Sequence, residues 1–327
     1  MTLSRRQVLN AGAGMLIAGA AGSAVAEDYP SKPIKIIVAL PPGSGLDADA
    51  RYWAAGLSAE LGQSVIVENR PGGATTIGTS IAVRSAPDGY TLLMGIPSSL
   101  CYMQELYTKL PYNPADFEPI SQLTALRCSV IANPSVPVSN AADLVALAKS
   151  KPGSLNVGTQ GVGTFQHLLG EWFSSVTGTK FTFIPYNTTS PYAALLAGEI
   201  HVIFDALPAA MSSVKAGKLK ALALSGAARH PNVPDLPTFD ELGIPGYDAS
   251  TWFGLLAPPG TPQPIIAKLA SACGAVARKP EVVQRYRDYG GEPVGSTATE
   301  FNRYIRSERS KWVAAVKRSG LKLELPT

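Results

Sequence analysis

Two glycine-rich segments of this chain each stand between a short apolar run and a stretch with helical periodicity. They span Pro41–Asp47 and Gly158–His167, and neither contains a lysine, an arginine or a cysteine. A turn that joins a strand to a helix directs unpaired backbone N–H groups out of the helix N-terminus, where the helix dipole favours negative charge. If the two turns face each other, they can hold a small anion between them.

Short β-branched runs alternate with helical stretches along most of the chain, which predicts an α/β fold with helices on both faces of parallel sheets. Strands are expected at Ile34–Leu40, Val65–Glu68, Thr91–Met94, Leu155–Gly158, Phe181–Ile184, Ile200–Phe204 and Ala221–Leu224. Helices are expected at Asp47–Leu61, from Gly78 to before Pro87, and at Ala141–Ser150, Phe165–Val176, Pro191–Ala197, Ala209–Ala216, Pro264–Arg278, Glu281–Tyr289 and Ala298–Ser319.

Two long apolar runs, Phe117–Asn133 and Ala249–Ala257, predict strands that cross between two lobes. The helices after residue 257 have only the strands of the first block to cover. We therefore expect one lobe from residues 27–127 and 254–327, and a second lobe from residues 128–253. The two open, mostly parallel sheets would be joined by hinge strands, with a binding cleft at the carboxyl ends of the strands.

The first 26 residues are typical of a cleaved export signal. A pair of arginines at Arg5 and Arg6 precedes an apolar stretch that ends in the small-residue site Ala24–Ala26. The arginine pair favours the twin-arginine route, and a general secretory signal is the alternative. The apolar stretch is too short and too rich in glycine for a membrane anchor. A periplasmic protein that begins at Glu27 is expected.

Charge and cysteine content exclude several classes of protein. The formal net charge is only +4, and no run of basic residues with interleaved aromatics points to nucleic acid. Three cysteines at irregular spacing, Cys101, Cys128 and Cys273, form neither a disulfide framework nor a metal-ligand pattern, so buried thiols are expected. We predict no metal site and no cofactor.

In the first turn, Gly43 and Gly45 allow close approach of the backbone, Ser44 offers a hydroxyl, and Asp47 is placed to cap the next helix. A dinucleotide fingerprint needs a third glycine, and a phosphate loop needs a lysine. The segment around Ser44 also lacks the first glycine of a nucleophile elbow, so a serine hydrolase is the weaker alternative. A plain tight turn is the other interpretation.

The second turn repeats this pattern, with Thr159 and Thr164 as hydroxyl donors. For His167, one turn into the helix, a structural hydrogen bond is a commoner role than that of a base. Asp205 follows an apolar strand and is expected to be buried at the cleft, with an N-cap for the helix at Ala209 as the alternative.

Ten segments carry a resemblance to a known family: Tyr29–Ile34, Pro41–Asp47, Val67–Gly73, Ala86–Leu92, Leu110–Tyr112, Gly161–Thr164 with His167, Ile184–Tyr186, Phe204–Ala210, Lys215–Leu219 and Trp252–Pro258. Through them essentially the whole mature chain resembles the periplasmic solute-binding proteins of tripartite tricarboxylate transporters, the Bug family.

The resemblance implies a monomeric, non-catalytic receptor of the two-lobed type II periplasmic-binding-protein fold. Such a receptor closes over a small carboxylate and delivers it to membrane transporter subunits, and a signalling sensor is the alternative partner. The candidate ligand-binding residues are Pro41, Gly43, Ser44, Gly45, Ser98, Thr159, Gly161, Gly163, Thr164, Phe165, Gln166 and Asp205. Weaker candidates are Arg127, His167 and Tyr186.

Some residues depart from what is usual in the family. Arg127 stands within a predicted lobe crossing, where it could reach a second ligand carboxylate or simply face solvent. Phe165 and Gln166 occupy positions that small residues or proline usually take, and an aromatic ring there can stack on a ligand ring. A dicarboxylate is therefore the expected ligand, with aromatic dicarboxylates included.

Overall fold

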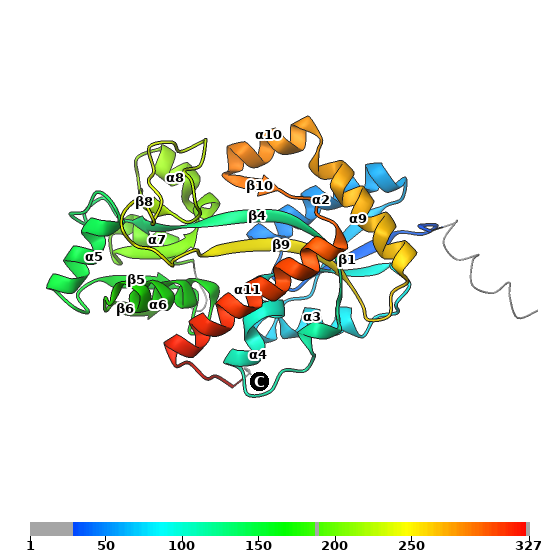
Figure 1. Cartoon of the computed structure of the whole chain (residues 1–327), viewed down its shortest axis with the longest axis horizontal. Coiled ribbons are helices and arrows are strands. Elements are labelled where there is room, and N and C mark those ends of the chain that lie inside the picture. The colour runs from blue at the N-terminus through cyan, green and yellow to red at the C-terminus, as the bar shows by residue number, and fades with distance from the viewer. Residues whose placement is uncertain (1–28, 187–189, 325–327) are drawn as a thin grey trace, which may run out of the picture.

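The computed structural model describes residues 29–186 and 190–324. The predicted export signal lies outside these residues. Within them, no helix is both long enough and apolar enough to span a bilayer. The two long strands predicted as crossings are β4 (Glu118–Ala132) and β9 (Ser250–Ala257), and they run side by side through the middle of the molecule (Figure 1).

The described strands form one mixed sheet in the order β2-β1-β3-β9-β4-β7-β5-β6, with β8 and β10 also paired to β4. At one end, β1 (Ile34–Val38) lies parallel to β2 (Val65–Asn69) and β3 (Thr91–Gly95). We call this the β1 end. At the other, the β5 end, β5 (Asn156–Thr159) lies parallel to β6 and β7. The remaining strands are β6 (Thr182–Pro185), β7 (Val202–Ala206), β8 (Lys220–Leu224) and β10 (Gly291–Pro293).

The α/β prediction is confirmed, but the sheet is continuous and mixed, because β4 pairs antiparallel with β9, β7, β8 and β10. Residues 118–127 of β4 pair with β9, whereas β7 pairs with residues 128–132. The strand therefore changes partners between Arg127 and Cys128. The lobe boundaries themselves stay a prediction.

Helices flank both ends of the sheet. At the β1 end they are α2 (Gly45–Leu61), α3 (Thr76–Val83), α4 (Met103–Leu106), α9 (Gln263–Ala277) and α10 (Pro280–Tyr289). At the β5 end they are α5 (Ala141–Ser150), α6 (Phe165–Thr177), α7 (Pro191–Ala197) and α8 (Met211–Lys215). Helix α11 (Ala298–Ser319) lies diagonally over the long strands and contacts both β4 and α6 (Figure 1).

The shortest helices and strands were not predicted, because three to five residues are too few to show a periodicity. These are β10, α4, the π-helix Ser98–Tyr102 and the 3-10 turns Gly73–Thr75, Pro114–Asp116 and Leu207–Ala210.

Aromatic side chains tie α11 to the rest of the core. The Trp312 ring of α11 contacts Tyr102 after β3 and both Phe165 and Trp172 of α6, with ring centroids 5.2 to 5.8 Å apart. Such tilted and edge-to-face contacts stabilise beyond their buried area. Trp312 therefore connects the two ends of the sheet beside the carboxyl ends of the parallel strands. The three cysteines are buried and unpaired in the part of the chain that the structure describes.

Candidate functional site

The first turn is held together by its own side chains. Ser44 is the N-cap of α2, and its Oγ accepts a hydrogen bond of 3.2 Å from the amide of Asp47. The predicted cap, Asp47, instead lies in the first helical turn, where its carboxylate accepts from the amide of Gly43 at 2.9 Å. The Gly43 N–H is thus already used. The free first-turn amides of α2 are those of Gly45 and Leu46, which have no acceptor within the helix.

The Asp47 carboxylate is nearly fully buried, and its charge is compensated. Arg51 pairs with it at 3.0 Å, and Asn69 donates a further hydrogen bond of 2.9 Å. Burial opposes ionisation, but the hydrogen bonds from Arg51, Gly43 and Asn69 together lower the pKa of Asp47 below its ordinary value. Asp47 therefore stays ionised and rigidifies the turn.

The second turn uses its polar groups in the same way. The His167 Nδ1 accepts from the amide of Gly163 at 2.9 Å, and the Thr164 hydroxyl donates to the carbonyl of Gly161 at 2.8 Å. His167 therefore makes a structural hydrogen bond within the turn, which is the commoner role for a histidine at this position. Thr164 is the N-cap of α6 without a capping side-chain bond, so the amides of Phe165 and Gln166 are left without an acceptor within the helix.

Both helix N-termini line one cavity of about 330 Å³ between the two ends of the sheet. It lies at the carboxyl ends of the parallel strands, where open α/β sheets bind ligands. Its lining residues are Leu40, Ser44, Gly45, Leu46, Ile96, Pro97, Ser98, Tyr102, Leu126, Gln160, Phe165, Gln166, Tyr192, Asp205, Ala206, Pro208, Ala209, Thr251 and Phe253.

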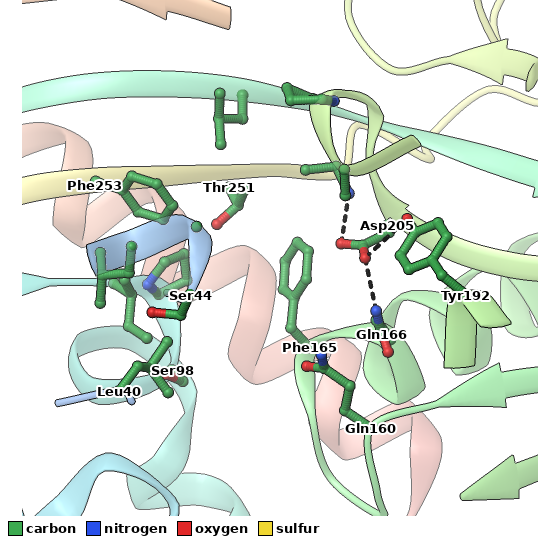
Figure 2. A pocket seen from close by; sticks show the side chains of 18 of the residues that line it. Leu40, Ser44, Ser98, Gln160, Phe165, Gln166, Tyr192, Asp205, Thr251 and Phe253 are labelled. Carbon is green, nitrogen blue, oxygen red and sulfur yellow. Dashed lines mark hydrogen bonds between the residues drawn. The ribbon is translucent and has the colours of Figure 1, made fainter. Parts of the chain in front are cut away.

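A second cavity of about 370 Å³ adjoins the first. The two share Leu40, Ile96, Ser98, Tyr102, Gln160 and Phe165. The other walls of the second cavity include Thr75 and the turn residues 161–164. Figure 2 shows the Phe165 side chain standing between the Ser44 side of the first cavity and its Asp205 side. Phe165 therefore helps to set both the length and the width available to a ligand.

Asp205 lies at the β5 side of the first cavity, half-buried at the end of β7. Its carboxylate accepts hydrogen bonds from Gln166 Nε2 at 2.6 Å, the Tyr192 hydroxyl at 3.2 Å and the amide of Ala206 at 2.8 Å (Figure 2). Burial outweighs these bonds and raises the pKa of Asp205. The N-cap alternative is wrong, because the cap of the turn Leu207–Ala210 is Ala206.

Among the residues that the structure describes, neither cavity is lined by a lysine, an arginine or a histidine. Asp205 is the one charged side chain among the lining residues named above. An anion in this cavity would therefore depend on neutral donors, which include the amides of the two helix N-termini, the hydroxyls of Ser44, Ser98 and Thr251, and the side-chain amide of Gln160.

The structure brings together half of the twelve main candidates in the first cavity: Ser44, Gly45, Ser98, Phe165, Gln166 and Asp205. Gly161, Gly163 and Thr164 line the second cavity. The other three main candidates line neither cavity: Pro41 and Gly43 lie exposed before the N-terminus of α2, and Thr159 is buried beneath the second turn. The three weaker candidates, Arg127, His167 and Tyr186, also line neither, and Tyr186 packs against the core cluster around Leu195.

Arg127 does not reach the cavity. Its neighbour Leu126 lines the cavity, and alternate residues of a strand point to opposite faces. The guanidinium of Arg127 instead pairs with Glu292 at 3.0 Å and donates to the carbonyl of Ala228. A role in holding a second ligand carboxylate is therefore a wrong prediction, and Arg127 links β4 to β10.

Several lining residues were missed. Thr251 and Phe253 stand two residues apart on β9, and period-2 alternation gives a signal that they share a face. Tyr192 lies in α7 and Gln160 in the second turn, but nothing local marks either side chain as facing a cavity. Their placement depends on how α7 and the turn pack against β7 and β5.

The serine hydrolase alternative requires a histidine near Ser44. His167, His201 and His230 each use Nδ1 to accept a backbone N–H, from Gly163, Asn156 and Asn232. These three are all the histidines of the chain. None lines the cavity that contains Ser44, so the hydroxyl has no neighbouring imidazole to act as its base.

Comparison with known proteins agrees with this architecture. Residues 50–321 match the model of a family described as the tripartite tricarboxylate transporter family receptor, TctC. This chain belongs to that family. The family and its fold are those of solute-binding proteins rather than of enzymes.

This TctC-family chain is 34% identical to Protein BugT of Bordetella pertussis, over 94% of its own length and 95% of that protein. It is similar in structure to Rpa4515 of R. palustris, solved with adipate, with a TM-score of 0.83, 32% identity and coverage of 90% and 99% of the two chains. MatC from Rhodopseudomonas palustris, with bound malate, gives a TM-score of 0.78 at 29% identity, with coverage of 88% and 100%.

Proposed function

We propose that this TctC-family protein is a periplasmic receptor that binds a small dicarboxylate and delivers it to a tripartite tricarboxylate-type membrane transporter. The observation that carries the proposal is the pair of helix N-termini, α2 and α6, that line one cavity from opposite ends of the sheet. Free amides at such positions are suited to a carboxylate.

The energetics agree with reversible binding. Hydrogen bonds to a charged group contribute about 1.5–3 kcal/mol each, whereas removal of a carboxylate from water costs several kcal/mol. The amides of Gly45, Leu46, Phe165 and Gln166, with water bridging where the gap is wide, can offset that cost. We expect dissociation constants near the micromolar range, which corresponds to about −8 kcal/mol.

A dicarboxylate fits the remaining walls. Leu40, Ile96 and Phe253 give the Ser44 side of the cavity an apolar lining that suits a hydrocarbon segment between two carboxylates. Adipate and malate, the ligands printed for two structural relatives, are both dicarboxylates. The Phe165 and Phe253 rings also make aromatic dicarboxylates reasonable ligands.

Delivery would follow from closure of the two lobes over the ligand. Residues from both ends of the sheet line the cavity, so a ligand contacts all of them only in a closed state and shifts the equilibrium toward it. We propose that the closed, monomeric receptor then docks on the transporter subunits after export through the N-terminal signal. A signalling sensor remains the alternative partner.

The test is calorimetric titration of residues 27–327 with adipate, malate, terephthalate, acetate and glucose. At least one dicarboxylate should bind in the micromolar range and raise the melting temperature by mass action. The variant Ser98→Ala removes a cavity hydroxyl, and Ser150→Ala removes one at the exposed end of α5 as a matched control. Tight binding of glucose without binding of any acid would overturn the proposal.

The partner is tested separately, by crosslinking of the liganded and unliganded receptor in membranes of its own source. Recovery of transporter subunits only with the liganded form supports delivery, whereas recovery of a sensor protein supports the alternative.

A further inference from the structure

We propose that the Asp205 side of the cavity is an acceptor subsite, so that the preferred ligand is a carboxylate that also carries a hydroxyl or ammonium group. This inference rests on the proposed function, because it assumes that the cavity holds a carboxylate. It adds a chemical requirement that the carboxylate-binding amides alone do not impose.

The first observation is the unused acceptor capacity of Asp205. Gln166 Nε2 and the Tyr192 hydroxyl both donate to Oδ2, while the amide of Ala206 is the one donor to Oδ1 among residues 29–186 and 190–324. An ionised carboxylate has about four acceptor positions. One position on Oδ1 is therefore still open, on a half-buried side chain that lines the cavity.

The second observation is the amide oxygen of Gln166. The residue is only 3% exposed and lines the same cavity, and its Oε1 has no hydrogen-bond partner among residues 29–186 and 190–324. The amide cannot simply be reversed, since that would place Oε1 2.6 Å from a carboxylate oxygen. A buried acceptor without a donor costs about 1–3 kcal/mol. Oε1 itself has almost no accessible surface here, so a ligand donor recovers this cost when binding turns the Gln166 side chain toward the cavity.

Charge leads to the same conclusion. The described walls of the cavity contain no cationic side chain, and three donors already converge on the Asp205 carboxylate. A ligand carboxylate placed there would face a like charge with no cation to compensate it. The amides of α2 and α6 therefore take the ligand carboxylates, and Asp205 with Gln166 takes a neutral or cationic donor.

Three side chains from separate elements of this chain build the subsite. Tyr192 comes from α7, Gln166 from the first turn of α6 and Asp205 from the end of β7. Figure 2 shows these three side chains gathered on one side of the cavity, across Phe165 from Ser44. A ligand that reaches from the α2 amides to Asp205 must therefore carry its donor group at a distance from the ligand carboxylate that the α2 amides bind.

The experiment compares matched ligands of two lengths: succinate, malate and aspartate, then adipate, 2-hydroxyadipate and 2-aminoadipate. In at least one series, we expect the hydroxy or amino acid to bind the unmodified receptor about 10-fold or more tightly than the plain acid, because an unpaired buried polar group discriminates strongly.

The variant Asp205→Asn should reduce this preference and strengthen binding of the plain acids, since Asn removes the charge and adds a donor. Gln166→Met keeps the volume but removes the neutral acceptor, and it should also reduce the preference. Asp116→Asn makes the same charge change on an exposed turn that does not line the cavity, and it should leave the ratio unchanged.

The proposal is overturned if plain dicarboxylates bind as tightly as their substituted partners in both series, or if the preference survives in both cavity variants. Binding of carboxylates without such a preference leaves the receptor function intact and removes only the subsite. If no carboxylate of any kind binds, both proposals fail. Circular dichroism melting of each variant shows whether it folds.

Discussion

Asp49 offers the sharpest test of how α2, the helix that follows the first turn, is held against the sheet. It lies one turn into α2, is buried, and accepts hydrogen bonds from the hydroxyls of Tyr286 and of Thr124, the latter at 2.8 Å. Trp53 Nε1 donates to the Tyr286 hydroxyl at 2.7 Å. The network joins α2, β4 and α10, and no cationic side chain of the described residues pairs with the Asp49 carboxylate. Burial therefore raises the pKa of Asp49 to about 6.

The sign of the effect follows from the raised pKa. A carboxyl that is harder to ionise in the folded state contributes its full stability below its unfolded pKa of 3.8, and loses it as the pH rises through about 6. At 1.36 kcal/mol per unit, the free energy of unfolding should fall by about 2 kcal/mol between pH 4 and pH 8 on account of Asp49 alone.

The perturbation is Asp49→Asn, which keeps the shape of the side chain and removes the titration. Urea unfolding of the ligand-free protein, unmodified and variant, at half-unit steps from pH 4 to pH 8 isolates the contribution, because all other groups cancel in the difference. We expect the free energy of unfolding of the variant, relative to that of the unmodified protein, to rise by about 2 kcal/mol from pH 4 to pH 8. The exposed change Asp116→Asn is the control. A difference that stays flat with pH would refute the reasoning.

Three further predictions concern the cavity and its surroundings. Ser44→Ala should lower stability by about 1 kcal/mol through loss of the α2 N-cap, and should weaken carboxylate binding, as calorimetry and thermal melting will show. Arg127→Gln should leave ligand affinity unchanged, since the side chain pairs with Glu292 away from the cavity; a several-fold loss would show that it reaches the ligand. Gly254→Ala should destabilise by about 1–3 kcal/mol, because the new Cβ would lie 2.1 Å from the Phe301 ring; an unchanged urea midpoint would contradict this.

Local sequence patterns were sufficient for most elements. The bounds of α5, α7 and α11 agree with the prediction. In α11 the capping box of Thr297 and Glu300 and the left-handed Gly320 mark both ends chemically. The π-helix Ser98–Tyr102 carries no such mark, and it supplies Ser98 and Tyr102 to the cavity only because β3 and α11 hold it there.

The sequence by itself determined the two glycine-rich turns, the helices that follow them and the family to which the chain belongs. Only the tertiary structure decided which polar groups of the cavity are free. Gln166 Nε2 and the Tyr192 hydroxyl, 39 and 13 residues away along the chain, both donate to Oδ2 of Asp205. Among the described residues, this leaves Oδ1 with one donor, the amide of Ala206. The physical reason is that strand and helix signals depend on neighbours in the chain, whereas a free hydrogen bond depends on every group that packing brings within reach.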